Sequence, residues 1–187
     1  IKIIIDILMK AIILSFLLIC LYSSCSDNIS DSPNPGTLEV RLRTEKGNFT
    51  YNDEFLLRIQ SLKILRADGA YADIFDNLHA IRDNVDIYNI LKDTILVIGE
   101  SYLPSDNFIK LLISIEPPDS LIYYGRKIKV EKDEPFDALV SLNIAKKIKS
   151  NERTVITIIT KADSLLYRNI DHFIYKHHYS IQQTVNQ

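Results

Sequence analysis

The sequence has no tryptophan, and its 187 residues include only five glycines, two cysteines and one methionine. The scattered glycines form no phosphate-binding loop, and no Gly-x-Ser-x-Gly, His-Glu-x-x-His or Cys-x-x-Cys motif occurs. The sequence therefore lacks the usual signatures of nucleotide hydrolysis, serine hydrolases, zinc proteases and thiol redox chemistry. We expect no catalytic residues, no bound metal and no cofactor.

An excess of positive charge is also absent. Lysine and arginine total 22 against 24 aspartates and glutamates, and no basic stripe or arginine cluster occurs. Proteins that bind nucleic acids neutralise phosphates with basic surfaces. We therefore expect no nucleic-acid partner.

The N-terminal region has the pattern of an export signal. Met9 begins a short basic segment, an apolar run covers residues 11–22, and small residues follow. This order is typical of a secretory signal peptide. We expect residues 9–24 to be the signal, and residues 1–8 to lie upstream of the true start.

A transmembrane anchor is the alternative for this stretch. A spanning helix needs about 20 consecutive apolar residues. Here Asp6 and Lys10 interrupt the apolar sequence on one side, and polar residues follow Tyr22 on the other. We therefore favour the signal peptide.

The end of the apolar run resembles a lipobox, the site where a signal peptidase cuts before a cysteine that becomes acylated. The sequence there reads Leu21-Tyr22-Ser23-Ser24-Cys25. The small residues Ser23 and Ser24 match the motif, whereas Tyr22 occupies the place where leucine is usual. The resemblance implies cleavage before Cys25 and a lipid on that cysteine. The alternative is an ordinary secretory signal with an incidental cysteine.

The cysteine count supports lipidation. Cys20 follows the bulky residues Leu18 and Ile19, so it is the poorer cleavage site, and it leaves with the signal. The mature chain then keeps Cys25 alone. A lone thiol in an exported protein needs an explanation, which acylation supplies. Each buried CH₂ of an acyl chain contributes about 0.8 kcal/mol to membrane binding.

Residues 25–35 have the composition of an extended linker, with serine, aspartate, asparagine and two prolines. This tether would hold the domain away from the membrane. Asp27 and Asp31 also resemble acidic signals that send lipoproteins to the outer face of the outer membrane. The alternative is a plain solvated linker, in which case the domain could lie on the periplasmic side of the membrane.

Residues 36–181 are long enough for one domain, and residues 182–187 form a polar tail. Alternation of apolar and polar side chains predicts a strand over residues 37–43, with Glu39 on the outer face. Apolar runs, β-branched residues and turn signals predict further strands at 55–65, 71–75, 95–98, 108–115, 121–124, 127–131, 138–144, 154–160 and 173–179.

The pattern also predicts a bulge, the core-facing side of one strand and a short helix. The phase of the apolar residues changes within the second strand, which predicts a bulge near Gln60-Ser61. In the strand over 108–115, Ile109, Leu111, Ile113 and Ile115 share one phase and should face the core. Residues 83–91 have near-helical spacing and predict one short helix. Many strands and a single small helix favour a β-sandwich.

The order of these segments resembles a prokaryotic lipoprotein domain of unknown function with a transthyretin-like, or carboxypeptidase-regulatory-like, β-sandwich. The matching segments are 36–40, 85–91 and 103–108, together with the hairpin at Tyr123-Tyr124-Gly125. The resemblance implies a transthyretin-like sandwich but no activity. Thr44-Glu45-Lys46 stands where the family has Asp-Ala-Pro, and residues 156–160 lack the family's aspartates, so no ligand role is carried over.

Histidines and paired carboxylates are the remaining candidates for chemistry. If one strand ran from His172 to His178, these two would share a face about 20 Å apart, while His177 would face the other way, so no pair of them could share a metal. The carboxylate pairs Asp133/Glu134 and Glu116/Asp119 lie beside prolines or turns, which indicates solvated loops.

Ten tyrosines make sugar stacking a possibility. Tyr123, Tyr124 and Tyr102 are the candidates for exposed rings, because the first two adjoin a turn and Tyr102 precedes Pro104. Packing within the sheets is the alternative, and the lack of tryptophan weighs against glycans.

We therefore expect a non-enzymatic lipoprotein of the cell envelope that acts in adhesion, surface structure or assembly. Its partner would be a protein or a second copy, bound through a sheet edge at residues 173–179. A carbohydrate-binding surface lipoprotein is the first alternative. An accessory subunit of an envelope hydrolase is the second.

Overall fold

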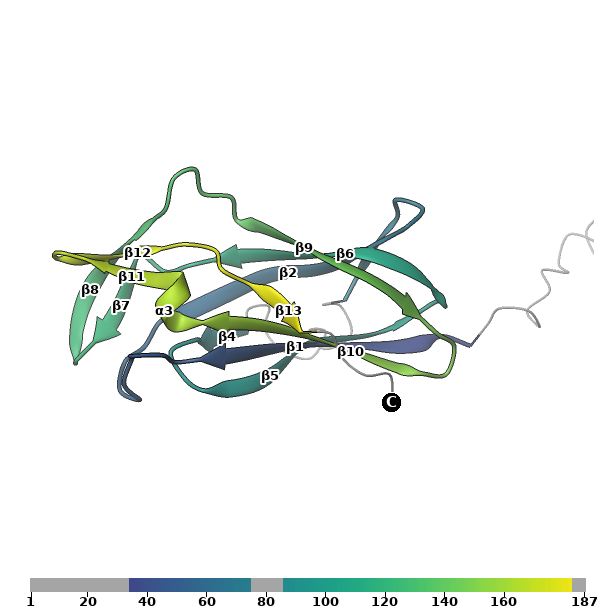
Figure 1. Ribbon diagram of the computed structural model, residues 1–187, viewed down its shortest axis with the longest axis horizontal. Helices are drawn as coiled ribbons and strands as arrows, with labels where there is room; N and C mark the ends of the chain where they lie inside the picture. The colour runs from purple at the N-terminus through teal and green to yellow at the C-terminus, as the bar shows by residue number, and fades with distance from the viewer. Residues whose placement is uncertain (1–33, 75–85, 183–187) are drawn as a thin grey trace, which may run out of the picture. The chain divides into compact units, whose positions relative to one another are not determined.

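A computed structural model describes residues 34–74 and 86–182 (Figure 1). The described residues form strands and one short helix, α3 (Ala162–Leu165), which lies between β10 and β11. The strands are β1 (Gly36–Glu45), β2 (Leu56–Arg66), β3 (Tyr71–Asp73), β4 (Asp86–Asn89), β5 (Thr94–Leu103), β6 (Asp106–Glu116), β7 (Ser120–Tyr123), β8 (Arg126–Lys132), β9 (Leu139–Ile148), β10 (Arg153–Lys161), β11 (Leu166–Asn169), β12 (His172–Tyr175) and β13 (Ser180–Gln182).

These strands form three sheets. The β1 sheet has the order β13-β10-β1-β5, in which β1 and β10 run parallel. The β2 sheet has the order β3-β2-β6-β9, and β4 also pairs with β2. The β12 sheet, with the order β11-β12-β8-β7, lies at one end of the domain (Figure 1).

The β1 and β2 sheets face each other across one hydrophobic core. Leu38, Val40 and Leu42 alternate along β1 and are buried, as predicted. The sheets pack closely at Gly99 of β5, where an added Cβ would lie 2.6 Å from a methyl carbon of Leu62 on β2. The predicted β-sandwich is therefore confirmed.

The predicted bulge in β2 is confirmed. The register against β6 shifts between Ile59 and Ser61, so that both Ile59 and Leu62 are buried. The extra residue of the bulge shifts the alternation of side chains by one position. The apolar residues before and after the bulge therefore both face the core.

The strand predicted over residues 108–115 is also confirmed, and it ends before Pro117. The prediction that Ile109 faces the core was wrong, because the register against β9 shifts between Phe108 and Lys110. This second bulge buries Phe108 and leaves Ile109 40% exposed, while Leu111 remains in the core.

The helix predicted over 83–91 is wrong for its described part. Residues 86–89 form β4, which pairs antiparallel with Leu56–Ile59, and residues 83–85 lie outside the described residues. The strand ends at Asn89, whose Oδ1 accepts hydrogen bonds from the backbone N–H groups of Phe55 and Leu91. A free edge on β2 outweighed the weak helical spacing.

The single last strand predicted over 173–179 is wrong as well. Strand β12 ends at Tyr175, and the chain then crosses to the β1 sheet, where β13 pairs with β10. Because β12 lies between β11 and β8, it offers no free edge. Tyr175 is fully buried.

The signal, Ser23, Ser24, Cys25 and the tether lie outside the described residues, as do residues 183–187. Among the described residues, no helix has the length and apolar character needed to cross a bilayer.

Candidate binding site

A tight turn between β7 and β8 carries two of the three tyrosines selected from the sequence. Tyr123 ends β7 and pairs with Arg126, which begins β8, so Tyr124 and Gly125 form a two-residue loop. Both loop residues have left-handed backbones, with φ of 48° and 72°. This is the pattern of a type I′ hairpin turn, and it leaves the Tyr124 ring 66% exposed.

A buried carboxylate fixes this turn. Asp53 is fully buried, and its Oδ1 accepts a 2.8 Å hydrogen bond from the backbone N–H of Tyr124. Its Oδ2 accepts a 2.7 Å bond from the backbone N–H of Thr50. Asp53 thus holds the turn after β1, which carries the exposed ring of Tyr51, against the β7–β8 turn.

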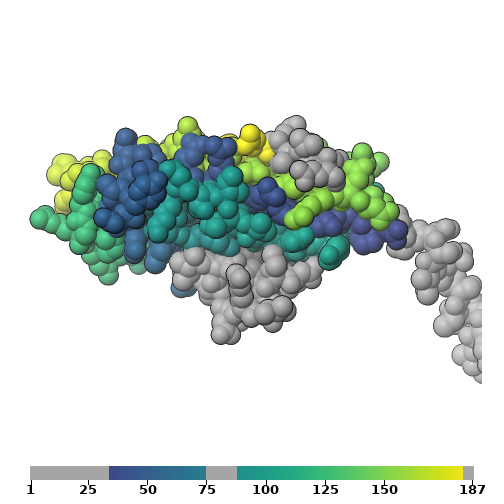
Figure 2. Space-filling view, turned by 90° about the horizontal axis from the view of Figure 1, so that it is seen from below, coloured from purple at the N-terminus to yellow at the C-terminus, as the bar shows by residue number. Residues whose placement is uncertain are grey.

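The backbone joins the same two segments. Glu54 and Ile122 form a β-bridge with two hydrogen bonds of 2.9 Å. Figure 2 shows the chain around residues 45–60 (blue) beside residues 120–130 (green) at one end of the domain. The turn that carries Tyr51 therefore lies beside the turn that carries Tyr124.

A pocket of about 200 Å³ adjoins this surface, and we call it the tyrosine pocket. It is lined by Asn48, Phe49, Tyr123, Asp163, Leu166, Arg168 and Phe173. Phe49, Leu166 and Phe173 are buried and form an apolar floor. The Tyr123 ring meets Phe173 edge-on, with 5.2 Å between ring centroids. The volume of the tyrosine pocket suits a single ring or side chain rather than a larger ligand.

The polar wall of the tyrosine pocket is rigidly held. The Asp163 carboxylate accepts hydrogen bonds from the backbone N–H and the Nδ2 atom of Asn48, at 3.1 to 3.2 Å. The preceding Gly47 has φ of 60°, and a Cβ there would lie 2.2 Å from Asp163 Oδ2. Only glycine suits this turn, which packs the end of β1 against α3.

Two cations lie over the tyrosine rings. The guanidinium of Arg168 is 5.6 Å from the centroid of the Tyr123 ring, and Lys46 Nζ is 4.2 Å from the centroid of Tyr51. Such contacts contribute about 0.5–1 kcal/mol at exposed sites. The site therefore combines apolar rings with positive charge.

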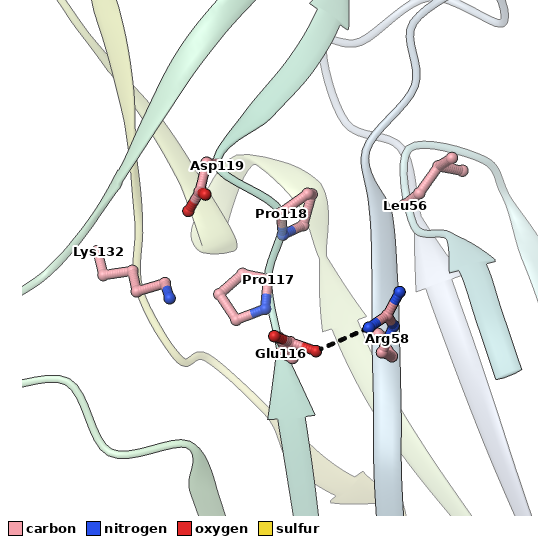
Figure 3. Close-up of a pocket in the computed structure, with 7 residues that line it drawn as sticks. All are labelled: Leu56, Arg58, Glu116, Pro117, Pro118, Asp119 and Lys132. Atoms are coloured by element: carbon pink, nitrogen blue, oxygen red, sulfur yellow. Dashed lines mark hydrogen bonds and ion pairs between the residues drawn. The ribbon is translucent and has the colours of Figure 1, made fainter. Parts of the chain in front are cut away.

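A second cavity, of about 370 Å³, opens where β6 ends at its two prolines (Figure 3). It is lined by Leu56, Arg58, Glu116, Pro117, Pro118, Asp119 and Lys132. The Glu116 carboxylate accepts from Arg58 at 3.2 Å and from Gln60 at 3.1 Å. Glu116 is thus engaged by β2, and nothing couples it to Asp119 as an acid–base pair.

The three candidate tyrosines do not form one site. Tyr123 and Tyr124 lie together, with ring centroids 4.5 Å apart. Tyr102 is exposed but pairs with Thr37 near the start of β1, whereas the tyrosine pocket lies beyond the end of that strand. At about 3.3 Å per residue, this separates Tyr102 from the pocket by roughly 25 Å. Tyr102 therefore lies apart from the other two candidates.

The side chains of His172 and His177 have structural partners. His172 Nδ1 lies 2.9 Å from the Asp171 carboxylate. His177 stacks on Phe136, and its Nε2 donates to the Asp137 carbonyl at 2.6 Å. Burial lowers the pKa of the His177 imidazole below its usual value.

The spacing predicted for His172 and His178 does not apply, because the strand ends at Tyr175. No three histidine, cysteine, aspartate or glutamate side chains of the described residues gather as a metal site. Asp133, of the Asp133/Glu134 pair, lies 3.6 Å from Lys176 Nζ in an exposed ion pair.

Sequence reasoning missed Asp53, Asn48, Asp163 and Arg168. A turn signal was present in Asn52-Asp53, because asparagine and aspartate before a strand favour turns. Nothing local connects Asn48 with Asp163, which lie 115 positions apart.

The chain matches no protein-family model, and searches of curated proteins and of solved structures gave no significant match.

Proposed function

We propose that this protein is a non-enzymatic binding and assembly module of the cell envelope, tethered to a membrane through lipid on Cys25. The export signal over residues 9–24 and the lipobox-like Ser23-Ser24-Cys25 support the anchor. The tether over 25–35 would let the domain reach its partner from the outer membrane. The transthyretin-like assignment belongs to this proposal, and it is supported by the sequence resemblance and by the sandwich architecture.

The observation that carries the proposal is the edge of the β1 sheet at β5. Among the described strands, β5 pairs only with β1, so its other side is the end of the sheet. Ile95 is 60% exposed and Val97 is 48% exposed on this ten-residue strand. Edge strands are usually short, or are protected by lysine or proline, and β5 has neither residue.

A partner strand would satisfy this edge by β-augmentation. Backbone hydrogen bonds would supply affinity, and side chains beside Ile95 and Val97 would supply specificity. Across the ladder these two residues pair with Arg43 and Arg41, which form ion pairs with Glu45 and Glu39. We propose that the strand comes from another envelope protein or from a second copy of this chain.

Crosslinking in cells tests this assignment. A photoreactive residue at Val97 should give an adduct of defined mass with a protein, whereas one at Ile109, on the other sheet, should not. Val97→Lys should weaken capture from a photoreactive residue at Ile95. Circular dichroism should show that the Val97→Lys chain remains folded. Equal adducts at Val97 and Ile109, or none at Val97, would remove β5 as the interface.

A second candidate function is carbohydrate binding at the tyrosine pocket. Tyr51 and Tyr124 are each 66% exposed, and Asp53 holds their turns together beside the pocket. Exposed aromatic rings with restrained backbones can stack on sugar rings. A glycan array with the wild-type chain and Tyr124→Ala tests this candidate, and Tyr102→Ala is the matched control. Absence of any glycan signal would leave protein binding alone.

A further inference from the structure

Two arginines beside Tyr123 have no acidic partner. Among the described residues, Arg126 and Arg168 form no ion pair. Every other arginine in that part of the chain lies within 4.0 Å of a carboxylate: Arg41, Arg43, Arg58, Arg66 and Arg153. Within the described residues, the other guanidinium groups are thus paired with carboxylates, and two remain unpaired at one place.

Both arginines are on the pocket face of the β12 sheet. Arg168 has the same phase along β11 as Leu166, which forms the pocket floor, and its guanidinium lies over the Tyr123 ring. Arg126 is directly opposite Tyr123 in the β7–β8 ladder, and such paired residues project from the same face. Two unpaired guanidinium groups therefore flank one tyrosine.

The nearby carboxylates accept hydrogen bonds from neutral donors. Asp163 accepts hydrogen bonds from Asn48, and Asp53 is fully buried between two backbone donors. On the other face of the β12 sheet, Lys129, Glu131 and Asp171 join His172 in a mixed-charge network. On the pocket face, the positive groups of Arg126, Arg168 and Lys46 outnumber the carboxylates of Asp53 and Asp163.

We propose that the tyrosine pocket binds a sugar ring that carries a carboxylate, as in an acidic polysaccharide. This inference rests on the carbohydrate-binding candidate and names its ligand class. The ring of the sugar stacks against the exposed tyrosines, and Arg168 and Arg126 bind the carboxylate. Arginine suits this role because its planar guanidinium matches a carboxylate with two parallel hydrogen bonds.

The aromatic surface around the pocket suits a chain of sugar rings. A pocket of about 200 Å³ holds one ring, and Tyr51 and Tyr124 extend the aromatic surface beyond it. Neighbouring rings of a polymer would meet Lys46, whose ammonium group lies above the ring of Tyr51. Lys46 forms no ion pair among the described residues. A polymer with a charge on every ring would therefore engage several positive groups in succession.

The test uses two ligands that differ only in charge. The full chain in detergent is titrated with an oligogalacturonate and with its methyl ester, which removes the charge and keeps the ring. We expect the acid to bind at least roughly tenfold more tightly than the ester, and its affinity to fall with added salt. Arg168→Gln should lower affinity for the acid by about tenfold and leave the ester unchanged.

The matched control is Arg58→Gln in the other cavity, which should change neither affinity. Arg126→Gln is a second variant, and circular dichroism checks that each chain is folded. If both ligands bind equally and Arg168→Gln changes neither, the acidic-sugar proposal is overturned while carbohydrate binding survives. If no neutral or acidic glycan binds, the carbohydrate candidate fails as well, and a phosphopeptide that binds instead would replace the ligand class.

Discussion

The carboxylate of Asp53 and the backbone N–H of Tyr124 are joined by a 2.8 Å hydrogen bond across 71 positions of the chain. This contact ties the segment after β1 to the β7–β8 turn. It makes the position of an exposed tyrosine depend on a buried acid.

Asp53→Ala should destabilise the protein and loosen the tyrosine surface. The substitution leaves the backbone N–H groups of Thr50 and Tyr124 without their acceptor, and each unsatisfied buried donor costs about 1–3 kcal/mol. Urea denaturation would measure the loss in the free energy of unfolding. Asp119→Ala, at an exposed position, is the control and should cost under about 0.5 kcal/mol. An equal loss for the two variants would contradict the role of Asp53.

Leu111→Ala should cost about 2–5 kcal/mol, because it leaves a cavity in the sandwich core. Ile109→Ala should cost much less, because the bulge beside Phe108 turns that side chain partly to solvent. Chemical denaturation of both variants is the measurement. A larger cost at Ile109 would show that the bulge is misplaced.

Acid should weaken the fold through His177. Its Nε2–H donates to the Asp137 carbonyl, so Nδ1 accepts from the Tyr175 hydroxyl, and the neutral ring fits this arrangement. Burial lowers the pKa of His177 in the folded state, whereas the unfolded value is about 6.5. Between these two values the unfolded chain binds more protons.

The stabilising contribution of His177 is therefore fully present above about pH 6.5 and is lost as the pH falls toward the lower folded pKa. Thermal unfolding of the wild type and of His177→Gln from pH 8 to 5 would measure it. The difference between the two should shrink in acid. His178→Gln, at an exposed position, should follow the wild type.

Cys25→Ser should abolish lipidation. The variant should accumulate as unprocessed precursor or as soluble protein, because serine cannot accept the thioether-linked lipid. Metabolic labelling with a fatty acid is the measurement, and Cys20→Ser is the matched control that should label normally. Label in the Cys25→Ser chain would refute the anchor.

Much of the sandwich follows from local sequence. The alternation of Leu38, Val40 and Leu42 predicts β1, and the change of phase in β2 predicts its bulge. The dipeptide Tyr124-Gly125 lies where the hairpin turns. These features depend on neighbouring residues alone, so one sequence is enough to locate them.

The failures depend on distant partners. Residues 86–89 form a strand because β2 has an open edge beside them, and Ile109 turns outward because β9 fixes the register of β6. Glu39 was expected on the outer face of β1, and it is there. It is nevertheless buried, because it forms ion pairs with Arg41 and with Arg153 of the neighbouring strand.

The candidate site was predictable only in part, for the same reason. A turn beside two tyrosines marked Tyr123 and Tyr124 in the sequence. The pocket itself needs Asn48, Asp163 and Arg168, which come from the end of β1, from α3 and from β11. Their proximity results from the pairing of β1 with β10 and of β11 with β12.

The parallel pairing of β1 with β10 has a consequence for how the molecule folds. Thr37 pairs with Arg153, so the centre of the β1 sheet joins the first described strand to one more than a hundred residues later. Contacts with such long sequence separation make folding slow, because a large loop must close before they form. A growing chain leaves one side of β1 unpaired until β10 has been synthesised. The β1 sheet is therefore completed late, and truncation before Arg153 should yield a chain that aggregates instead of a smaller domain.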